Sequence, residues 1–253
     1  MNTRCISSFF IYYLPCRVPS RKKNCNTLSI DVVSTAQLLR EGFVSLQNKK
    51  CGDALRIFQQ GMVVSSQSPQ AVPPHVLREP IATNGNASIH ACSLELSKLN
   101  ENLSPHNVFL VFDRVFLLQQ DTSVPQDIAS TICIYNIALP HHIRATTHAH
   151  TSTLCFRRAR HFYLLALRAA QACVDVEDPD DPTLPIVMAA MNNIGHIHCH
   201  FAQTNEMKII FESLCSLLPF LAGRQDMGQS DQMFFCSCKC TVGHCILQGA
   251  AAA

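Results

Sequence analysis

The sequence predicts a mainly α-helical protein of about six helices, arranged as helical hairpins with an inserted extended or β-hairpin segment and disordered termini. A packing pattern of small and aromatic residues recurs three times, and apolar residues flank it at helical intervals. Hydrophobic residues make up 47% of the chain and charged residues 15%, against about 25% charged residues in an average globular protein. A chain of 253 residues with this composition can bury a sizeable core. A largely disordered protein is therefore excluded.

The first helical hairpin is expected in residues 38–62. Gly42 is followed twelve positions later by Ala54, four further on by the aromatic Phe58, and then by the small Gly61. A small residue midway along one helix lets a second helix approach closely, and the aromatic side chain fills the space between them. The spacing therefore predicts two packed antiparallel helices joined by a short turn.

The same spacing recurs in residues 134–167 and 191–214, and the middle copy has nine extra residues in its turn. The matching positions are Ala138, Ala159, Tyr163 and Ala166 in the middle copy, and Gly195, Met207, Phe211 and Leu214 in the last. Three hairpins of one design are therefore expected, and hairpins without common ancestry are the alternative.

With these motifs the chain resembles the tetratricopeptide repeat family in a degenerate form. The segments IYNIALPHHIRA, RRARHFYLLAL and MNNIGHIH are similar to parts of algal tetratricopeptide-like proteins. Met207 and Leu214 depart from the pattern because they replace small residues. The copies also start 96 and 57 residues apart, where the family repeat is about 34 residues long.

The resemblance implies a non-enzymatic interaction or scaffold protein, whose concave groove binds a peptide or a protein partner. A copy of the repeat that has lost its activity is a further alternative. The groove residues implied by the resemblance are Leu39, Phe43, Leu46, Gln47, Tyr135, Leu139, His142, Asn192, His196, Cys199 and His200.

Domain boundaries follow from composition. Residues 1–30 are expected to be a poorly ordered leader, 31–220 the helical domain with an insertion at 67–127, and 221–253 a poorly ordered Cys-rich tail. Within the insertion, residues 88–96 alternate weakly and residues 108–118 are rich in Val and Phe, as strands are. Two extended segments or a hairpin lying against the helices are favoured, and a helix at 108–118 is the alternative.

Two groups of residues have the chemistry of metal ligands. His196 and His200 are four residues apart and would share one face of a helix, but two ligands do not complete a zinc site. The tail provides soft ligands without the CxxC spacing of zinc fingers. A metal-binding or thiol-redox protein is thus the alternative function, and its residues would be Cys236, Cys238, Cys240, His244 and Cys245.

No nucleophile, nucleotide-binding or metalloprotease motif is present, so neither an enzyme nor a cofactor is expected. A formal net charge of +2 gives no sign of a nucleic acid or membrane partner. The 14 cysteines are interpreted as mostly free thiols in a cytoplasmic protein. The apolar run at residues 5–14 is too short to span a bilayer. A targeting role for this run is the alternative to a cytoplasmic location.

Overall fold

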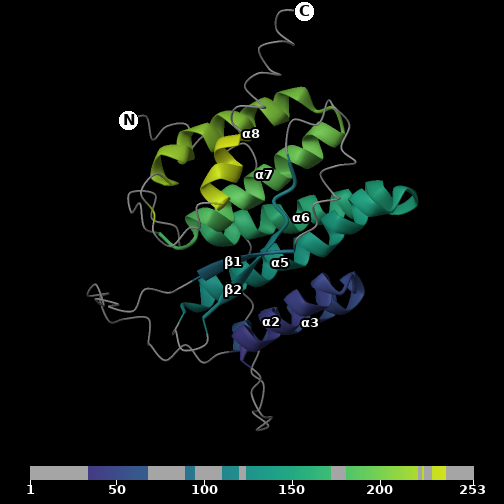
Figure 1. Cartoon of the computed structure of the whole chain (residues 1–253), viewed down its shortest axis with the longest axis vertical. Helices are drawn as coiled ribbons and strands as arrows, with labels where there is room; N and C mark the ends of the chain where they lie inside the picture. Colours follow the sequence, from purple (N-terminus) through teal and green to yellow (C-terminus); the bar gives the residue numbers. More distant parts are fainter. Residues whose placement is uncertain are drawn as a thin grey trace, which may run out of the picture.

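The protein is mainly helical, as predicted, in a computed structural model that describes residues 34–67, 89–94, 110–119, 124–171, 181–221, 224 and 230–237. The expectations for the leader, for much of the insertion and for the tail beyond residue 237 lie outside the described residues. The six long helices are α2 (Thr35–Gln47), α3 (Cys51–Gln67), α5 (Gln126–Thr147), α6 (Ser152–Gln171), α7 (Leu184–His200) and α8 (Thr204–Leu217). Each of them contacts the next in chain order, and the three hairpins stack upon one another (Figure 1).

The first hairpin packs as its spacing predicts. Gly42 of α2 lies against the ring of Phe58 of α3, so closely that a Cβ atom at Gly42 would lie 2.2 Å from Cε1 of Phe58. Ala54 and Phe58 are both fully buried. The hairpin is therefore closed by an aromatic ring that requires a glycine opposite.

The turns of the first and last hairpins are structural copies of each other. Lys49 and Ala202 both adopt a left-handed backbone, with φ of 59° and 53°. The amide of each donates to the carbonyl three residues before it, and the following amide donates to the carbonyl five residues before it, at 2.8–3.0 Å. Lys49 follows Gly42 by seven residues, and Ala202 follows Gly195 by seven residues. Both hairpins therefore share their packing register and their turn.

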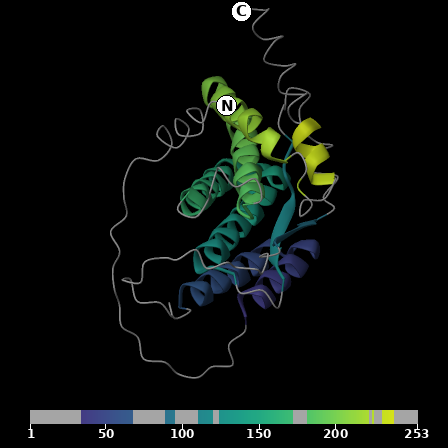
Figure 2. The same cartoon turned by 90° about the vertical axis from the view of Figure 1, so that its left-hand side faces the viewer.

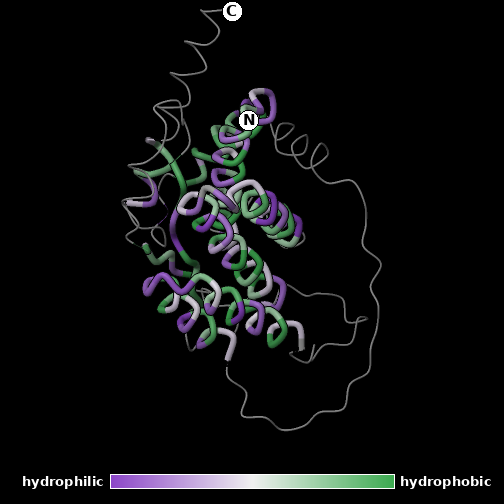
Figure 3. The backbone as a smooth tube through the Cα atoms, turned by 90° about the vertical axis from the view of Figure 1, so that its right-hand side faces the viewer, coloured by the Kyte–Doolittle hydropathy of each residue, from purple (hydrophilic) through white to green (hydrophobic). Residues whose placement is uncertain are grey.

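Helices α5 and α7 form the centre of the stack. Burial extends around nearly the whole circumference of α7 and around most of α5, which is typical of helices enclosed by other elements. The outer helices alternate hydrophobic and hydrophilic residues along their turns (Figure 3). Two 3-10 helices, η1 (Ala149–Thr151) and η2 (Leu218–Leu221), follow α5 and α8.

The predicted extended segments form a two-stranded antiparallel sheet. Strand β1 (Ile89–Ser93) pairs with β2 (Arg114–Leu118) in a register that places Ala91 opposite Phe116. The extended interpretation favoured for residues 108–118 is confirmed over the part described, since residues 114–118 form a strand and residues 110–113 are not helical. Both strands lie along one side of the helical stack (Figure 2).

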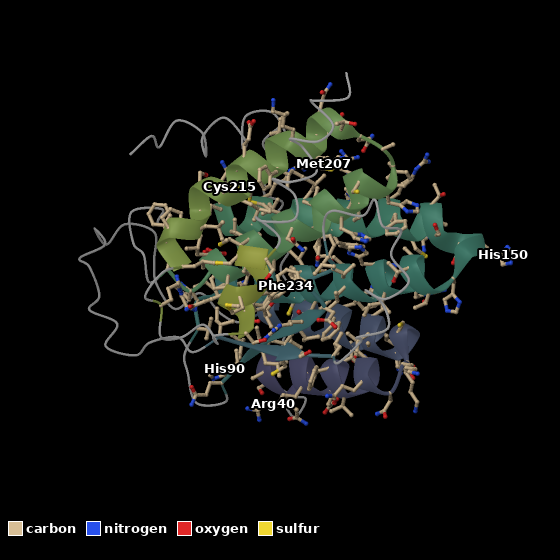
Figure 4. The ribbon with its side chains drawn as sticks, turned by 45° about the horizontal axis from the view of Figure 1, so that its top comes forward. Arg40, His90, His150, Met207, Cys215 and Phe234 are labelled. Carbon is tan, nitrogen blue, oxygen red and sulfur yellow. The ribbon has the colours of Figure 1, made fainter. Side chains whose placement is uncertain are left out.

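Residues 230–237 form a further short helix, called the C-terminal helix below, which lies within the segment expected to be a poorly ordered tail. This helix lies next to the strands (Figure 2). Its Phe234 side chain is partly buried against the core, whereas His150 projects outward at the tip of the α5–α6 hairpin (Figure 4). Among the described helices, none is both long and apolar enough to cross a membrane.

Candidate functional site: an asparagine face that holds an extended segment

Asn136, in the middle of α5, binds the backbone of strand β2. Its side-chain Oδ1 accepts a hydrogen bond from the amide of Phe116 at 3.1 Å, and its Nδ2 donates to the carbonyl of the same residue at 2.8 Å. A carboxamide has the donor and acceptor arrangement of a peptide group. One asparagine therefore replaces a neighbouring strand for both backbone groups of Phe116.

Asn193 of α7 does the same for Phe112. Its Oδ1 accepts from the Phe112 amide at 2.8 Å, and its Nδ2 donates to the Phe112 carbonyl at 3.1 Å. The adjacent Asn192 donates from Nδ2 to the carbonyl of Leu110 at 2.8 Å. We call Asn136, Asn192 and Asn193 the strand-binding face, and residues 110–118 the resident segment.

The resident segment satisfies its two edges with different partners. Strand β1 takes one edge, and at the end of that pairing the amide of Leu94 donates to the carbonyl of Asp113 at 3.2 Å. The strand-binding face takes the opposite edge at Leu110, Phe112 and Phe116. Because buried backbone groups require partners, these asparagines allow a strand to lie directly on a helical layer.

Aromatic rings enclose the resident segment. The Phe112 ring stacks on Phe235, with 5.2 Å between centroids, and meets the edge of Phe234 at 5.1 Å. Phe116 meets Tyr135 edge-on at 5.0 Å, and the Tyr135 hydroxyl donates to the Phe112 carbonyl at 3.4 Å. Residues from α5 and from the C-terminal helix therefore enclose the segment from two sides.

Arg114 connects the resident segment to the same C-terminal helix. Its guanidinium forms an ion pair with Asp231, donates to the Ser230 hydroxyl at 2.8 Å, and lies 5.6 Å from the centroid of the Phe112 ring. Asp231 is only 4% exposed. Burial raises the pKa of Asp231, while the charge of Arg114 acts in the opposite direction.

A chain of buried hydrogen bonds extends from the strand-binding face into the α5–α6–α7 core. Nδ2 of Asn193 donates to the Tyr163 hydroxyl at 3.0 Å, and that hydroxyl lies 3.3 Å from Nδ1 of His142. Nε2 of His142 lies 2.9 Å from Nδ1 of His196. The two bonds of Asn193 to Phe112 fix which of its side-chain atoms is nitrogen, so the Tyr163 hydroxyl accepts from Asn193 and has its own proton to donate to His142.

Burial keeps this chain neutral. It lowers the pKa of His142 well below its ordinary range and that of His196 to about 3, and neighbouring histidines act in the same direction. Burial also raises the pKa values of Tyr135 and Tyr163. The low pKa values favour the neutral form of both imidazoles within the hydrogen-bonded chain.

The structure places the predicted groove residues in different environments. Tyr135 and Asn192 contact the resident segment, and His142 and His196 belong to the hydrogen-bonded chain behind it. Two of the predicted groove residues are exposed, Gln47 and His200, and two are half-buried, Phe43 and Cys199. The others are buried: Leu39, Leu46, Tyr135, Leu139, His142, Asn192 and His196. Most of the predicted groove therefore lies inside the protein.

The residues expected to pack the repeats lie between helices. Met207 and Phe211 are half-buried against the core. The other packing residues are buried: Ala54, Phe58, Ala138, Ala159, Tyr163, Ala166 and Gly195. Asn136 and Asn193 were missed as site residues, although each is adjacent to a predicted one. Their signal is an asparagine within an apolar helical stretch, IYNIAL or MNNIGH, because a buried carboxamide requires partners.

The metal-competent residues do not come together in the part of the chain that the structure describes. His196 and His200 share a face, since both rings contact Phe156, and His198 forms a 2.6 Å hydrogen bond with Gln203. Cys236 is an exposed free thiol, whereas Cys238, Cys240, His244 and Cys245 lie outside the described residues. No group of three His, Cys, Asp or Glu side chains among the described residues could hold a metal ion.

Chemically, the arrangement holds the extended backbone of the resident segment. Three carboxamides supply its donors and acceptors, aromatic rings enclose its side chains, and a buried carboxylate meets its one cation. No family model, curated protein or solved structure matches the chain, so the contacts of the resident segment are the basis for assigning a function.

Proposed function

We propose that this protein is a non-enzymatic interaction module that binds an extended segment of a protein or peptide partner through the strand-binding face. The supporting observation is that Asn193 pairs with both backbone groups of Phe112. The resident segment occupies the face as such a ligand would. Its backbone is recognised by side chains of helices that follow it in the sequence.

Backbone recognition suits a module of this kind. A carboxamide that pairs with a peptide group contacts no side chain of its ligand, and strand addition to an edge uses the same main-chain bonds. The face could therefore accept any extended segment whose side chains fit the surrounding rings. Neither a cofactor nor a nucleic acid takes part in this proposal.

The buried histidines support a binding role over a catalytic one. The side chains of His142 and His196 are 0% and 1% exposed, and their nitrogens contact each other and Tyr163. A general acid or base must reach its substrate. In this protein the pair orients Tyr163 and, through it, Asn193.

The free thiols support a reducing compartment, and we propose the cytoplasm. Among the described cysteines, those at positions 51, 92, 133, 155 and 236 are free thiols. Burial raises the pKa of the Cys133 thiol to about 12, so it behaves as a small apolar side chain.

A partner must exchange with the resident segment to bind. A tethered ligand competes at an effective concentration of about millimolar, so a partner with equal contacts and micromolar concentration loses to the resident segment. Exchange requires either additional contacts by the partner or a weakened resident segment. The second condition can be created by mutation.

The test uses a fluorescent peptide that covers residues 108–120, with a Gly-Ser linker for solubility, and the full chain carrying Phe112→Ala and Phe116→Ala. Both substitutions remove fully buried rings from the resident segment and leave the strand-binding face intact. We expect micromolar binding to this variant by fluorescence anisotropy and no detectable binding to the wild-type protein. A scrambled peptide is the control.

Adding Asn193→Ala to the same variant should abolish peptide binding, because the peptide then loses the two backbone hydrogen bonds that Asn193 makes. If the variant with only Phe112→Ala and Phe116→Ala retains its helical circular dichroism and binds no peptide, the proposal is wrong. Should the double variant not fold, the single Phe116→Ala protein and hydrogen exchange of residues 110–118 under excess peptide provide the same test. Unchanged exchange would then contradict the proposal.

A further inference from the structure

We propose that the strand-binding face selects a segment of the form aromatic–x–basic–x–aromatic, for which Phe112, Arg114 and Phe116 are the internal template. This inference rests on the proposed function and names the ligand class of the same site. Alternate residues of a strand point to the same side, so the three template residues belong to one side of the resident segment. Each of them meets a different feature of the surrounding structure.

The first aromatic position is enclosed by the C-terminal helix. The Phe112 ring lies 5.1 Å and 5.2 Å from the rings of Phe234 and Phe235, with edge and stacked geometry, and Phe112 is 1% exposed. Stacked and edge-to-face contacts are the favoured arrangements of aromatic pairs. A smaller residue at this position would leave a space between two phenylalanines.

The second aromatic position is four residues further along the segment and meets α5. The Phe116 ring contacts Tyr135 edge-on at 5.0 Å and is 1% exposed. Tyr135 also contacts Tyr163, with 5.4 Å between ring centroids, so this position lies directly above the buried polar chain. The distance between the two aromatic positions is therefore fixed by two separate elements, the C-terminal helix and α5.

The basic position is recognised by the carboxylate of Asp231. Asp231 is buried and forms an ion pair with Arg114, while Ser230 accepts a hydrogen bond from the same guanidinium at 2.8 Å. Arg114 also lies over the Phe112 ring, so the basic residue supports the aromatic one beside it. A neutral or acidic residue in a ligand would leave the buried Asp231 carboxylate uncompensated, which disfavours that ligand strongly.

The asparagines fix the register in which the three template residues lie on the face. Asn193 binds the backbone of the first aromatic position and Asn136 that of the second. The basic residue is then placed midway between them, opposite Asp231. Backbone bonds therefore position the ligand, while the aromatic rings and the carboxylate select its sequence.

One atom of the face allows a partner to bind more tightly than the resident segment does. Oδ1 of Asn192 is buried and accepts no hydrogen bond from the described residues, although Nδ2 of the same side chain donates to Leu110. A buried acceptor without a donor is costly. A partner that donates a hydrogen bond at this end of the segment makes a contact that the described part of the resident segment lacks.

The test compares peptides against the full chain that carries Phe112→Ala and Phe116→Ala. The peptide with residues 108–120 is varied at one position at a time, to Arg114→Lys, Arg114→Glu or Phe112→Ala, and the dissociation constants are measured by anisotropy. We expect a loss below about tenfold for Arg114→Lys and at least 100-fold for Arg114→Glu and Phe112→Ala. Size-exclusion chromatography monitors whether a second copy of the chain takes the place of the peptide.

A charge exchange provides the decisive comparison. The Arg114→Glu peptide should regain at least tenfold in affinity when the protein also carries Asp231→Arg, and the unmodified peptide should weaken on that protein. Equal binding of all peptides would overturn the sequence pattern and leave the proposed function standing. Failure of every peptide, including the unmodified one, would overturn the proposed function as well.

Discussion

Asn193 and Phe112 are 81 residues apart in the sequence and pair like neighbouring residues of a sheet, through two hydrogen bonds of 2.8 Å and 3.1 Å. Both residues are buried, at 0% and 1% exposure. The pair joins the inserted segment to the central helix of the stack. It also begins the chain of hydrogen bonds that reaches His196.

The first prediction concerns this pair. Asn193→Ala should lower the free energy of unfolding by about 2 kcal/mol or more, since the substitution leaves the buried Phe112 amide without a partner and its carbonyl with only the longer bond from Tyr135, and an unpaired buried group costs about 1–3 kcal/mol. Asn193→Asp should be similarly destabilising, because a carboxylate oxygen would face the Phe112 carbonyl. Urea denaturation measures both. Gln47→Ala, on the exposed end of α2, is the control and should change stability by less than about 0.5 kcal/mol.

The second prediction concerns acid. The pKa values of His142 and His196 are lowered in the folded protein, to about 3 for His196, so below about pH 6.5 the unfolded chain binds protons that the folded chain does not. Stability should therefore decrease as the pH falls from 6.5 toward 5, by up to about 1.4 kcal/mol per pH unit for each histidine. Denaturation at several pH values measures the slope.

The matched variants for the acid prediction are His196→Gln and His150→Gln. Glutamine does not titrate, so the His196→Gln protein should show a shallower loss of stability between pH 6.5 and 5. His150 is exposed at the tip of the α5–α6 hairpin, and its replacement should leave the slope unchanged. Equal slopes for the wild type and His196→Gln would contradict the role of burial at His196.

The third prediction concerns the close approach of α2 and α3. Gly42→Ala should destabilise the protein by about 1–3 kcal/mol, because its Cβ would meet the Phe58 ring. Phe58→Leu in the same protein should restore part of the loss. Gly52→Ala is the matched control, since nothing lies within 4 Å of a Cβ there, and it should stabilise α3 by up to about 1 kcal/mol. Thermal unfolding ranks the four proteins.

The fourth prediction concerns the two equivalent turns. Lys49→Gly and Ala202→Gly should each stabilise the protein by about 0.5–1 kcal/mol, because glycine adopts a left-handed backbone without the steric penalty of a Cβ. Ala169→Gly, within α6, should destabilise by about 1 kcal/mol. Destabilisation by Ala202→Gly in calorimetry would show that the turn depends on contacts of its side chain.

The helical hairpins could be predicted from the sequence because their determinants are local. The spacing from Gly42 to Phe58 defines which faces meet, and the structure shows that contact directly. The extended nature of residues 110–118 was also predictable, because Val and Phe favour strands. These properties depend on residues near each other in the chain, so a single sequence contains them.

The strand-binding face could be predicted only in part. Asn192 of this face and the neighbouring Tyr135 were expected in a partner groove, whereas Asn136 and Asn193 were not singled out. Their partners Phe116 and Phe112 are 20 and 81 residues away, and no sequence spacing links a carboxamide on a helix to the backbone of a distant strand. The contacts of Asp231 and Phe235 with the same segment were equally inaccessible, because both residues are far in the sequence from Arg114 and Phe112, which they contact.

The sequence by itself therefore determined a mainly helical protein with paired helices and an inserted extended segment, because periodicity and residue size act locally. Only the tertiary structure decided that the insertion lies across α5 and α7 and contacts Tyr135 and Asn192, two of the residues expected to line a partner groove. The physical reason is the requirement that buried polar groups be paired. The strand needed donors and acceptors along its free edge, and three asparagines on two helices provide them.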